Sequence, residues 1–354
     1  MKMFFFLLPF LLILPSVKAQ TEDSISFDFF DSNKKLFVIG EFHFENDGHL
    51  QLALVDYIKS NTSIDAFIFE VSPEVGKIFN DYVLHGNREN DLLVILSMYE
   101  KEVTCKLKLI LDHIKKHNLA NPQKIQVKGV DMYNYYKFSR QMTGLRIIFP
   151  ELKTLNLPVA KNNIANEKVK NYSYGKTVYE INNLIKELSG HPEQYRQCLG
   201  NRLETYKEHL DQLKIYYANN HPRQWRILDS IRENILSENL IHIIDSNKVS
   251  LMICGANHAL YKSNDDFIYG YPYTSMVANA KQKYPDEIYS IILQYYNQKN
   301  YKKVWQLHLL NEPFNTYFEN NPSDYVIFTE EEIDHHPAAK ERCDMVILKN
   351  TSKK

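Results

Sequence analysis

The chain has 354 residues, and its 42 Lys and Arg residues nearly balance 43 Asp and Glu residues, for a formal net charge of −1. A charge this close to neutral argues against a nucleic acid as partner, because nucleic-acid binders present clustered positive charge. The length is sufficient for one large α/β domain with an insertion or for two domains.

The first 19 residues are typical of a secretory signal peptide. Lys2 makes the start positive, residues 4–14 are an apolar run, and residues 17–19 (Val-Lys-Ala) resemble a cleavage site. We expect the mature chain to begin at Gln20 and to be exported, as a periplasmic or secreted protein. Removing Lys2 and Lys18 changes the net charge from −1 to −3. The apolar run is too short to span a bilayer stably, so no membrane span is expected after cleavage.

Residues 36–39 (Leu-Phe-Val-Ile) form a short apolar run that predicts a buried strand. Gly40 is expected to end this strand, with Glu41 and His43 directly after it and an amphipathic helix soon afterwards. In open α/β sheets, ligands bind at the carboxyl ends of the strands. Alternate residues of an extended turn point the same way, so we expect Glu41 and His43 to face one cleft.

Three further apolar strands are predicted, and each ends at or near a titratable residue. Residues 64–70 end on Glu70, residues 125–130 precede Asp131, and residues 249–254 precede a turn that contains His258. If these strands are neighbours, their polar ends share one rim of the sheet. Carboxylates and imidazoles at such a rim shift each other's pKa values, which favours a histidine that acts as a general base near neutral pH.

Residues from about 150 to 220 differ in character from the rest of the chain. Apolar residues recur at helical spacing on both sides of His191-Pro192, which predicts two amphipathic helices. We interpret them as an antiparallel helical hairpin inserted over the sheet, and a coiled-coil dimerisation hairpin is the alternative. Closely spaced late strands at 288–294, 303–309 and 325–329 indicate antiparallel pairs at one edge. The predicted fold is therefore α/β, with a mixed, mostly parallel central sheet flanked by helices.

Short motifs in a fixed order resemble the erythromycin esterase-like family, which belongs to a wider group with ChaN-type haem-uptake proteins and the TraB/Tiki proteins. They are GEFH at 40–43, FE at 69–70, GVD at 129–131, RENILSEN at 232–239 and GANHA at 255–259. RENILSEN resembles the family's helical R-D-x-x-M-x-E-N signature, with Glu233 in place of Asp and Leu236 in place of Met. The resemblance covers residues 36–329 and implies a single domain over residues 20–354, with the helical insertion at about 150–220.

The resemblance implies an exported hydrolase in which water activated by His43 cleaves a carboxylic ester or a lactone. It implies that Glu41 and Glu70 orient His43 or the water and that His258 is a second catalytic imidazole. It also implies that Arg232 stabilises an oxyanion or holds a carboxylate or ester of the substrate.

Asp131 and Tyr133 are assigned to the binding of a small ester or lactone. Tyr133 belongs to a Tyr-rich segment that would offer apolar surface to a bulky substrate. No cofactor is expected, and the sequence does not indicate an oligomeric state.

Other functions remain open from the sequence. A metal-dependent protease or hydrolase of the Tiki/TraB type would use Glu41, His43, Glu70 and His258 as ligands of a divalent ion. An uptake protein would bind haem or another ligand without catalysis, and a surface or structural protein would keep the fold alone. The chain has no Gly-x-Ser-x-Gly elbow, which argues against a serine nucleophile.

The four cysteines have no Cys-x-x-Cys spacing, which argues against a structural zinc site. Cys105 and Cys198 both lie in predicted helices. The sequence leaves open whether they form a disulfide in an oxidising compartment or stay as free thiols.

Overall fold

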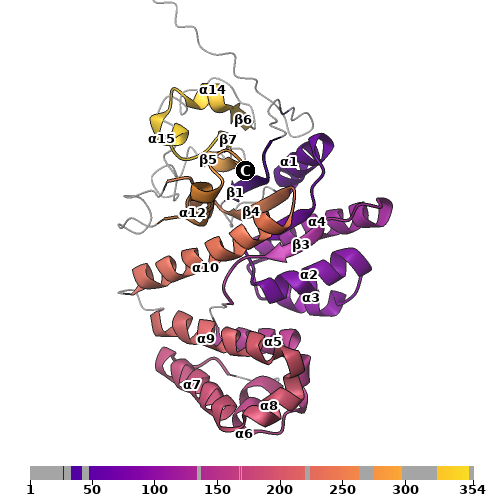
Figure 1. Cartoon of the computed structure of the whole chain (residues 1–354), viewed down its shortest axis with the longest axis vertical. Coiled ribbons are helices and arrows are strands. Elements are labelled where there is room, and N and C mark those ends of the chain that lie inside the picture. The colour runs from indigo at the N-terminus through magenta and orange to yellow at the C-terminus, as the bar shows by residue number, and fades with distance from the viewer. Residues whose placement is uncertain are drawn as a thin grey trace, which may run out of the picture.

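The computed structural model describes residues 27, 33–41, 48–133, 137–166, 168, 170–219, 224–262, 274–296 and 325–350. The signal peptide, His43 and the strand predicted at 303–309 lie outside these residues. Figure 1 shows a central sheet with helices on both faces and a further group of helices, α5 to α9, at one end of the molecule. Among the described helices, none is long and apolar enough to cross a bilayer.

In the described part of the chain, seven strands form one sheet in the order β3-β2-β4-β1-β5-β7-β6. The strands are β1 (Leu36–Glu41), β2 (Ala66–Phe69), β3 (Gln126–Gly129), β4 (Ser250–Gly255), β5 (Ile288–Tyr296), β6 (Tyr325–Phe328) and β7 (Met345–Asn350). All neighbouring strands of this sheet are parallel except β6 and β7, which are antiparallel. The mixed, mostly parallel sheet is therefore confirmed. The antiparallel pair at its far edge joins β6 to β7, whereas β5, expected among the antiparallel strands, is parallel to both of its neighbours.

The strands are apolar on both sides because helices cover both faces of the sheet. In β1, Phe37 and Ile39 join one core cluster, whereas Leu36 and Val38 join a second cluster on the opposite face. Alternate side chains of a strand point to opposite faces, so one continuous apolar run supplies both cores. The first face carries α1 (Gly48–Asn61), α2 (Pro73–His85), α3 (Glu89–Leu96) and α4 (Lys101–Ala120), and the second carries α10 (Trp225–Ser246), α11 (Ala256–Ala259), α12 (Met276–Lys283), α14 (Glu330–Ile333) and α15 (Pro337–Lys340).

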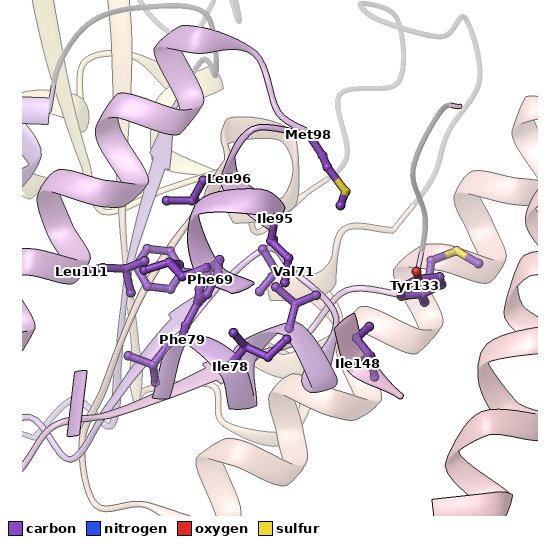
Figure 2. Close-up of a cluster of buried hydrophobic side chains, with 14 of the residues drawn as sticks. Phe69, Val71, Ile78, Phe79, Ile95, Leu96, Met98, Leu111, Tyr133 and Ile148 are labelled. Carbon is purple, nitrogen blue, oxygen red and sulfur yellow. The ribbon is translucent and has the colours of Figure 1, made fainter. Parts of the chain in front are cut away.

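Figure 2 shows the first core where β2 meets the helices that cover it. The rings of Phe69, from β2, and Phe79, from α2, lie edge to face with centroids 6.1 Å apart. Leu111 of α4 is buried in the same cluster. Aromatic and aliphatic side chains from three elements therefore fix the end of β2, where Glu70 follows.

The group of helices between β3 and α10 corresponds to the predicted insertion and is larger than a hairpin. The two long predicted helices are α7 and α9, which pack against each other. Shorter elements precede and separate them. The group consists of α5 (Phe138–Ile148), η2 (Pro150–Thr154), α6 (Pro158–Ala160), η3 (Lys161–Ala165), α7 (Tyr174–Gly190), α8 (Pro192–Leu199), η4 (Gly200–Arg202) and α9 (Leu203–Asn219).

Strand β1 continues through Gly40 to Glu41, so the expectation that Gly40 ends the strand is wrong. A Cβ atom at Gly40 would lie 2.7 Å from Cβ of Ala259 and 2.8 Å from Cδ1 of Ile292. These distances are shorter than van der Waals contact. Glycine is needed here because α11 packs directly on β1, and not because the chain turns.

Candidate active site

The carboxyl ends of β3, β2, β4 and β1 form one rim, because these strands are parallel neighbours. Glu41, the last residue of β1, pairs in register with Gly255, the last residue of β4. Glu70 follows β2, and its Oε2 accepts a hydrogen bond of 2.8 Å from the Gly255 N–H. The backbone N–H of Asp131 donates to Val71 at 2.9 Å, which places Asp131 beside the end of β2.

Arg232 of α10 is the centre of a buried charge network at this rim. Its Nε and Nη2 donate to the two carboxylate oxygens of Asp131 at 2.9 and 2.7 Å. The same Nη2 lies 2.5 Å from Oε1 of Glu70. Burial alone lowers the pKa of Arg232, but the carboxylates of Asp131 and Glu70 outweigh burial and raise it well above its ordinary value. A bidentate, charge-assisted contact of this kind fixes the orientation of the guanidinium.

The charge of Asp131 depends on two opposing effects. Burial raises the pKa of its carboxyl group, and the Arg232 guanidinium opposes this rise. Asp131 Oδ1 also accepts a hydrogen bond of 2.7 Å from the Met132 N–H. Asp131 therefore anchors Arg232 from the end of β3, and it is only 6% exposed.

His258 lies on α11, immediately after β4, between two carboxylates. Its Nδ1 contacts the carboxylate of Glu233, and its Nε2 lies 3.3 Å from Oε1 of Glu70. Burial lowers the pKa of this imidazole, but the charges of Glu233 and Glu70 outweigh burial and raise it to about 10. The two carboxylates therefore favour the imidazolium form of His258.

Two positive groups converge at the centre of the network. Nη1 of Arg232 lies 3.4 Å from Nε2 of His258. Both atoms are hydrogen-bond donors when His258 is protonated, so in that state the contact is a close approach of two donors and not a hydrogen bond between them. Convergent donors of fixed orientation suit an oxyanion or a carboxylate.

Glu41 belongs to a second buried cluster on the same rim. Nζ of Lys106, from α4, lies 2.6 Å from Oε2 of Glu41. Nε2 of Gln51, from α1, donates to the same carboxylate oxygen. The exposed fractions of Glu41, Lys106 and Gln51 are 7%, 3% and 1%, so the cluster is closed to bulk water.

The structure thus brings four of the predicted site residues into one network: Glu70, Asp131, Arg232 and His258. Glu41 lies on the same rim but contacts different partners. His43 lies outside the described residues, so its role as the base stays a prediction.

Tyr133 lies within the core that joins the sheet to the helical group. It is 1% exposed, and its hydroxyl donates to the carbonyl oxygen of Gln141 at 2.7 Å. Its ring lies 4.8 Å from that of His209, measured between centroids. Figure 2 shows Tyr133 on the side of this core where Ile148 lies. Its assignment to substrate binding stays a prediction.

The charged residues that sequence reasoning missed are Glu233 and Lys106. Glu233 lies inside the RENILSEN motif, where the sequence comparison treats it only as a replacement for Asp. In the structure it contacts His258 and accepts a hydrogen bond of 2.6 Å from the Met276 N–H at the start of α12. Lys106 lies four and eight residues before Ile110 and Ile114, so it shares the apolar face of α4. A lysine on the apolar face of a helix is the sequence feature that could have indicated a buried partner for Lys106.

Three of the four residues predicted as metal ligands, Glu41, Glu70 and His258, lie at this rim, and the metal site stays a prediction because His43 lies outside the described residues. Glu70 already contacts a guanidinium and an imidazolium, and Glu41 contacts an ammonium. An ion bound there would lie beside fixed positive charges, which repel it. Among the residues that the structure describes, no group of three or more His, Cys, Asp and Glu is arranged to hold a metal.

The two cysteines that the sequence left open as a pair are free thiols. Cys105 is exposed on α4, and Cys198 is half-buried on α8. Sγ of Cys198 lies 3.2 Å from the carbonyl oxygen of Glu151, in the helical group. No disulfide therefore links the helical group to α4.

The protein belongs to the α/β class. It has a mostly parallel sheet, a charge network at the carboxyl ends of the strands and a group of helices beside the sheet. Among solved structures, a mutant of the erythromycin esterase EreC in its open conformation has this fold, with 11% identity, a TM-score of 0.56 and coverage of 91% of each chain. A Bacillus cereus protein matches with 15% identity, a TM-score of 0.54 and coverage of 90% of this chain and 89% of that one.

A succinoglycan biosynthesis protein matches with 15% identity, a TM-score of 0.53 and coverage of 91% of this chain and 89% of that one. No protein-family model matches the sequence, and a search of curated proteins finds no match. The likeness extends over nearly the whole chain, so the chain has the erythromycin esterase-like fold that its motifs predict.

Proposed function

We propose that this protein is a hydrolase that cleaves a carboxylic ester or lactone by attack of a water molecule at the rim of the sheet. One observation carries the proposal: Nη1 of Arg232 and Nε2 of His258 converge, 3.4 Å apart, inside a shell of three carboxylates. When water adds to an ester carbonyl, negative charge develops on the carbonyl oxygen. A preorganised cationic donor at that oxygen lowers the barrier, and losing such a donor typically costs about 10²–10³ in kcat.

The charge state of His258 separates the roles of the two predicted histidines. An imidazolium with a pKa of about 10 has no free lone pair to take a proton from water at neutral pH. The general base of the proposal is therefore His43, two residues after Glu41. Arg232 donates to the developing oxyanion, and His258 gives its Nε2 proton to the leaving alkoxide, whose basicity exceeds that of the imidazole. The proton that His43 takes from water then restores His258.

Glu70 and Glu233 serve this reaction by holding His258 and Arg232. Glu70 contacts both cations, at 3.3 Å and 2.5 Å, and Glu233 contacts the far side of the imidazole. Neither needs to touch the substrate to act. The proposed substrate is a small ester or lactone, and the typical signal peptide supports action outside the cytoplasm, in the periplasm or after secretion.

Hydrolysis of a panel of p-nitrophenyl esters and macrolide lactones by the mature chain tests the proposal. The variants are His43→Ala, Arg232→Lys and His258→Asn, with His49→Ala as the control because His49 is exposed on α1. We expect wild-type turnover that persists in chelator and falls by about 10²-fold or more in each site variant. The control should keep full activity.

Two results would contradict the proposal, and each would favour a different function. Turnover that requires added Mn²⁺ or Zn²⁺ would favour a metal-dependent hydrolase. No turnover on any ester, together with a Soret band in the purified protein, would favour a haem-binding protein.

A further inference from the structure

The Glu41–Lys106 pair is buried more deeply than an ordinary ion pair of a surface helix. Lys106 Nζ lies 2.6 Å from Glu41 Oε2, and the two side chains are only 4% and 7% exposed. Gln51 donates to the same oxygen from a third element, α1. A strand end and two helices separated along the chain thus converge on one carboxylate.

Packing does not account for a lysine at this position. Lys106 lies on the face of α4 that also buries Ile110 and Ile114. Burying an ammonium costs desolvation free energy that only a close counter-charge and good hydrogen bonds offset. Replacing a buried ion pair by apolar residues is often neutral or stabilising, so stability alone is a weak reason for this pair.

The rim has the same arrangement on both sides of β4. On the side of β2, Arg232 lies 2.5 Å from Glu70, and on the side of β1, Lys106 lies 2.6 Å from Glu41. Each carboxylate therefore has a cationic side chain at hydrogen-bond distance. In metal-dependent hydrolases a divalent ion supplies positive charge against such carboxylates. In this protein the side chains of Arg232 and Lys106 supply that positive charge.

We propose that Lys106 is the resident cation of Glu41 and holds, at the carboxyl end of β1, the position that a divalent metal ion would otherwise take. Lys106 is a positioning residue, because it acts through Glu41. The link to catalysis rests on the proposed function: Lys106 fixes the Glu41 carboxylate two residues before His43. The charge assignment itself stands on the geometry of Glu41, Lys106 and Gln51 and does not depend on turnover.

Mn²⁺ binding, measured by titration calorimetry and by metal content after dialysis, tests the charge assignment. The variants are Lys106→Met and Lys106→Arg, with Lys116→Met as the control because Lys116 is exposed on the same helix. We expect no binding up to about 1 mM Mn²⁺ in the wild type, Lys106→Arg and Lys116→Met. Lys106→Met should bind at least about tenfold more tightly, because the ammonium 2.6 Å from Glu41 Oε2 no longer repels the ion.

Circular dichroism confirms that each variant is folded, and Lys106→Gln replaces Lys106→Met if the latter does not fold. Stoichiometric Mn²⁺ or Zn²⁺ binding by the wild type would overturn the inference. So would equal Mn²⁺ affinity in the wild type and in Lys106→Met.

Activity gives a separate readout. If the wild type hydrolyses esters, kcat should fall in Lys106→Met with little change in KM, and Lys106→Arg should restore most of it. If the wild type hydrolyses none of them, the proposed function fails, whereas the metal measurements still decide the role of Lys106.

Discussion

Nε2 of His258 lies 3.3 Å from Oε1 of Glu70, while the other ring nitrogen contacts Glu233. An imidazole between two buried carboxylates is held in its protonated form. The rim therefore holds two cationic groups, Arg232 and His258, among its acidic side chains. This charge state is what makes His258 a donor in the proposed reaction and leaves the role of base to another residue.

Raising the pH should destabilise the folded protein through His258. Its pKa is about 10 in the folded protein and close to 6.5 in an unfolded chain, so the folded state binds this proton more tightly. The resulting stabilisation is complete below about pH 6.5 and is lost as the pH rises through about 10. We expect a loss on the order of a few kcal/mol in the free energy of unfolding.

Urea unfolding from about pH 7 to about pH 10.5 measures this loss. His258→Gln should show a shallower pH dependence than the wild type, because it has no proton to lose. His242→Gln is the control, since His242 is exposed on α10. Equal pH dependence in the wild type and His258→Gln would contradict the assignment of an imidazolium.

Replacing Arg232 should be among the most destabilising single changes in this protein. Arg232→Met removes the guanidinium from the carboxylates of Asp131 and Glu70, and removal of one partner of a buried pair costs about 3–5 kcal/mol. Arg196→Met, which breaks an exposed pair with Glu193, should change stability by less than about 1 kcal/mol. Denaturant unfolding compares the two variants directly.

A second substitution separates charge from packing at Arg232. Adding Asp131→Asn to Arg232→Met removes the negative charge of one of the two carboxylates that lost the guanidinium, so it should recover part of the lost stability. If the double variant is no more stable than Arg232→Met, the destabilisation comes from lost packing and not from buried charge.

The strands and their polar ends were accessible from the sequence because a strand covered on both faces is a short continuous apolar run. β1, β2 and β4 are buried along their whole length, whereas the edge strand β3 has an exposed Gln126 and a half-buried Lys128. A titratable residue lies at or near the end of each of the four strands. β7 is missing from the predicted elements although residues 345–348 are apolar. A run near the end of the chain gives no local sign that it inserts between β5 and the edge strand β6.

The partners of the charged residues were not accessible in the same way. Lys106 contacts a residue 65 positions earlier, and Arg232 contacts one 162 positions earlier. Such contacts depend on how α4 and α10 pack over the sheet, which no local pattern encodes. Gly40 shows the same limit, because glycine is required there by the packing of α11, which lies more than two hundred residues later in the chain. From the local sequence alone, Gly40 is expected to end the strand in a turn.

The thiol content should distinguish free cysteines from a disulfide. Cys105 is exposed and Cys198 half-buried, whereas Cys254 and Cys343 are buried, and burial raises the pKa of both buried thiols. In the native protein we expect Cys105 to react fast with a thiol reagent, Cys198 more slowly and the other two hardly at all. All four should react after unfolding without reductant. Two reactive thiols in the unfolded protein would instead show a disulfide.

Adding one methyl group at Gly40 should disturb both stability and the site. In Gly40→Ala the new Cβ would lie 2.7 Å from Ala259 Cβ and 2.8 Å from Ile292 Cδ1, so α11 must move away from β1. Overpacking of this kind costs about 1–3 kcal/mol. Because α11 carries His258, the shift also moves Nε2 away from Arg232, and ester turnover should fall in protein that is still folded.

Gly175→Ala is the matched control, since no atom lies within 4 Å of a Cβ built at Gly175 in the first turn of α7. Alanine is a better helix former than glycine, so this change should be neutral or stabilise the protein by up to about 1 kcal/mol. Urea unfolding and the ester assay on both variants complete the test. Equal stability of Gly40→Ala and the wild type would mean that α11 does not pack directly on β1, and the position of His258 would then need another explanation.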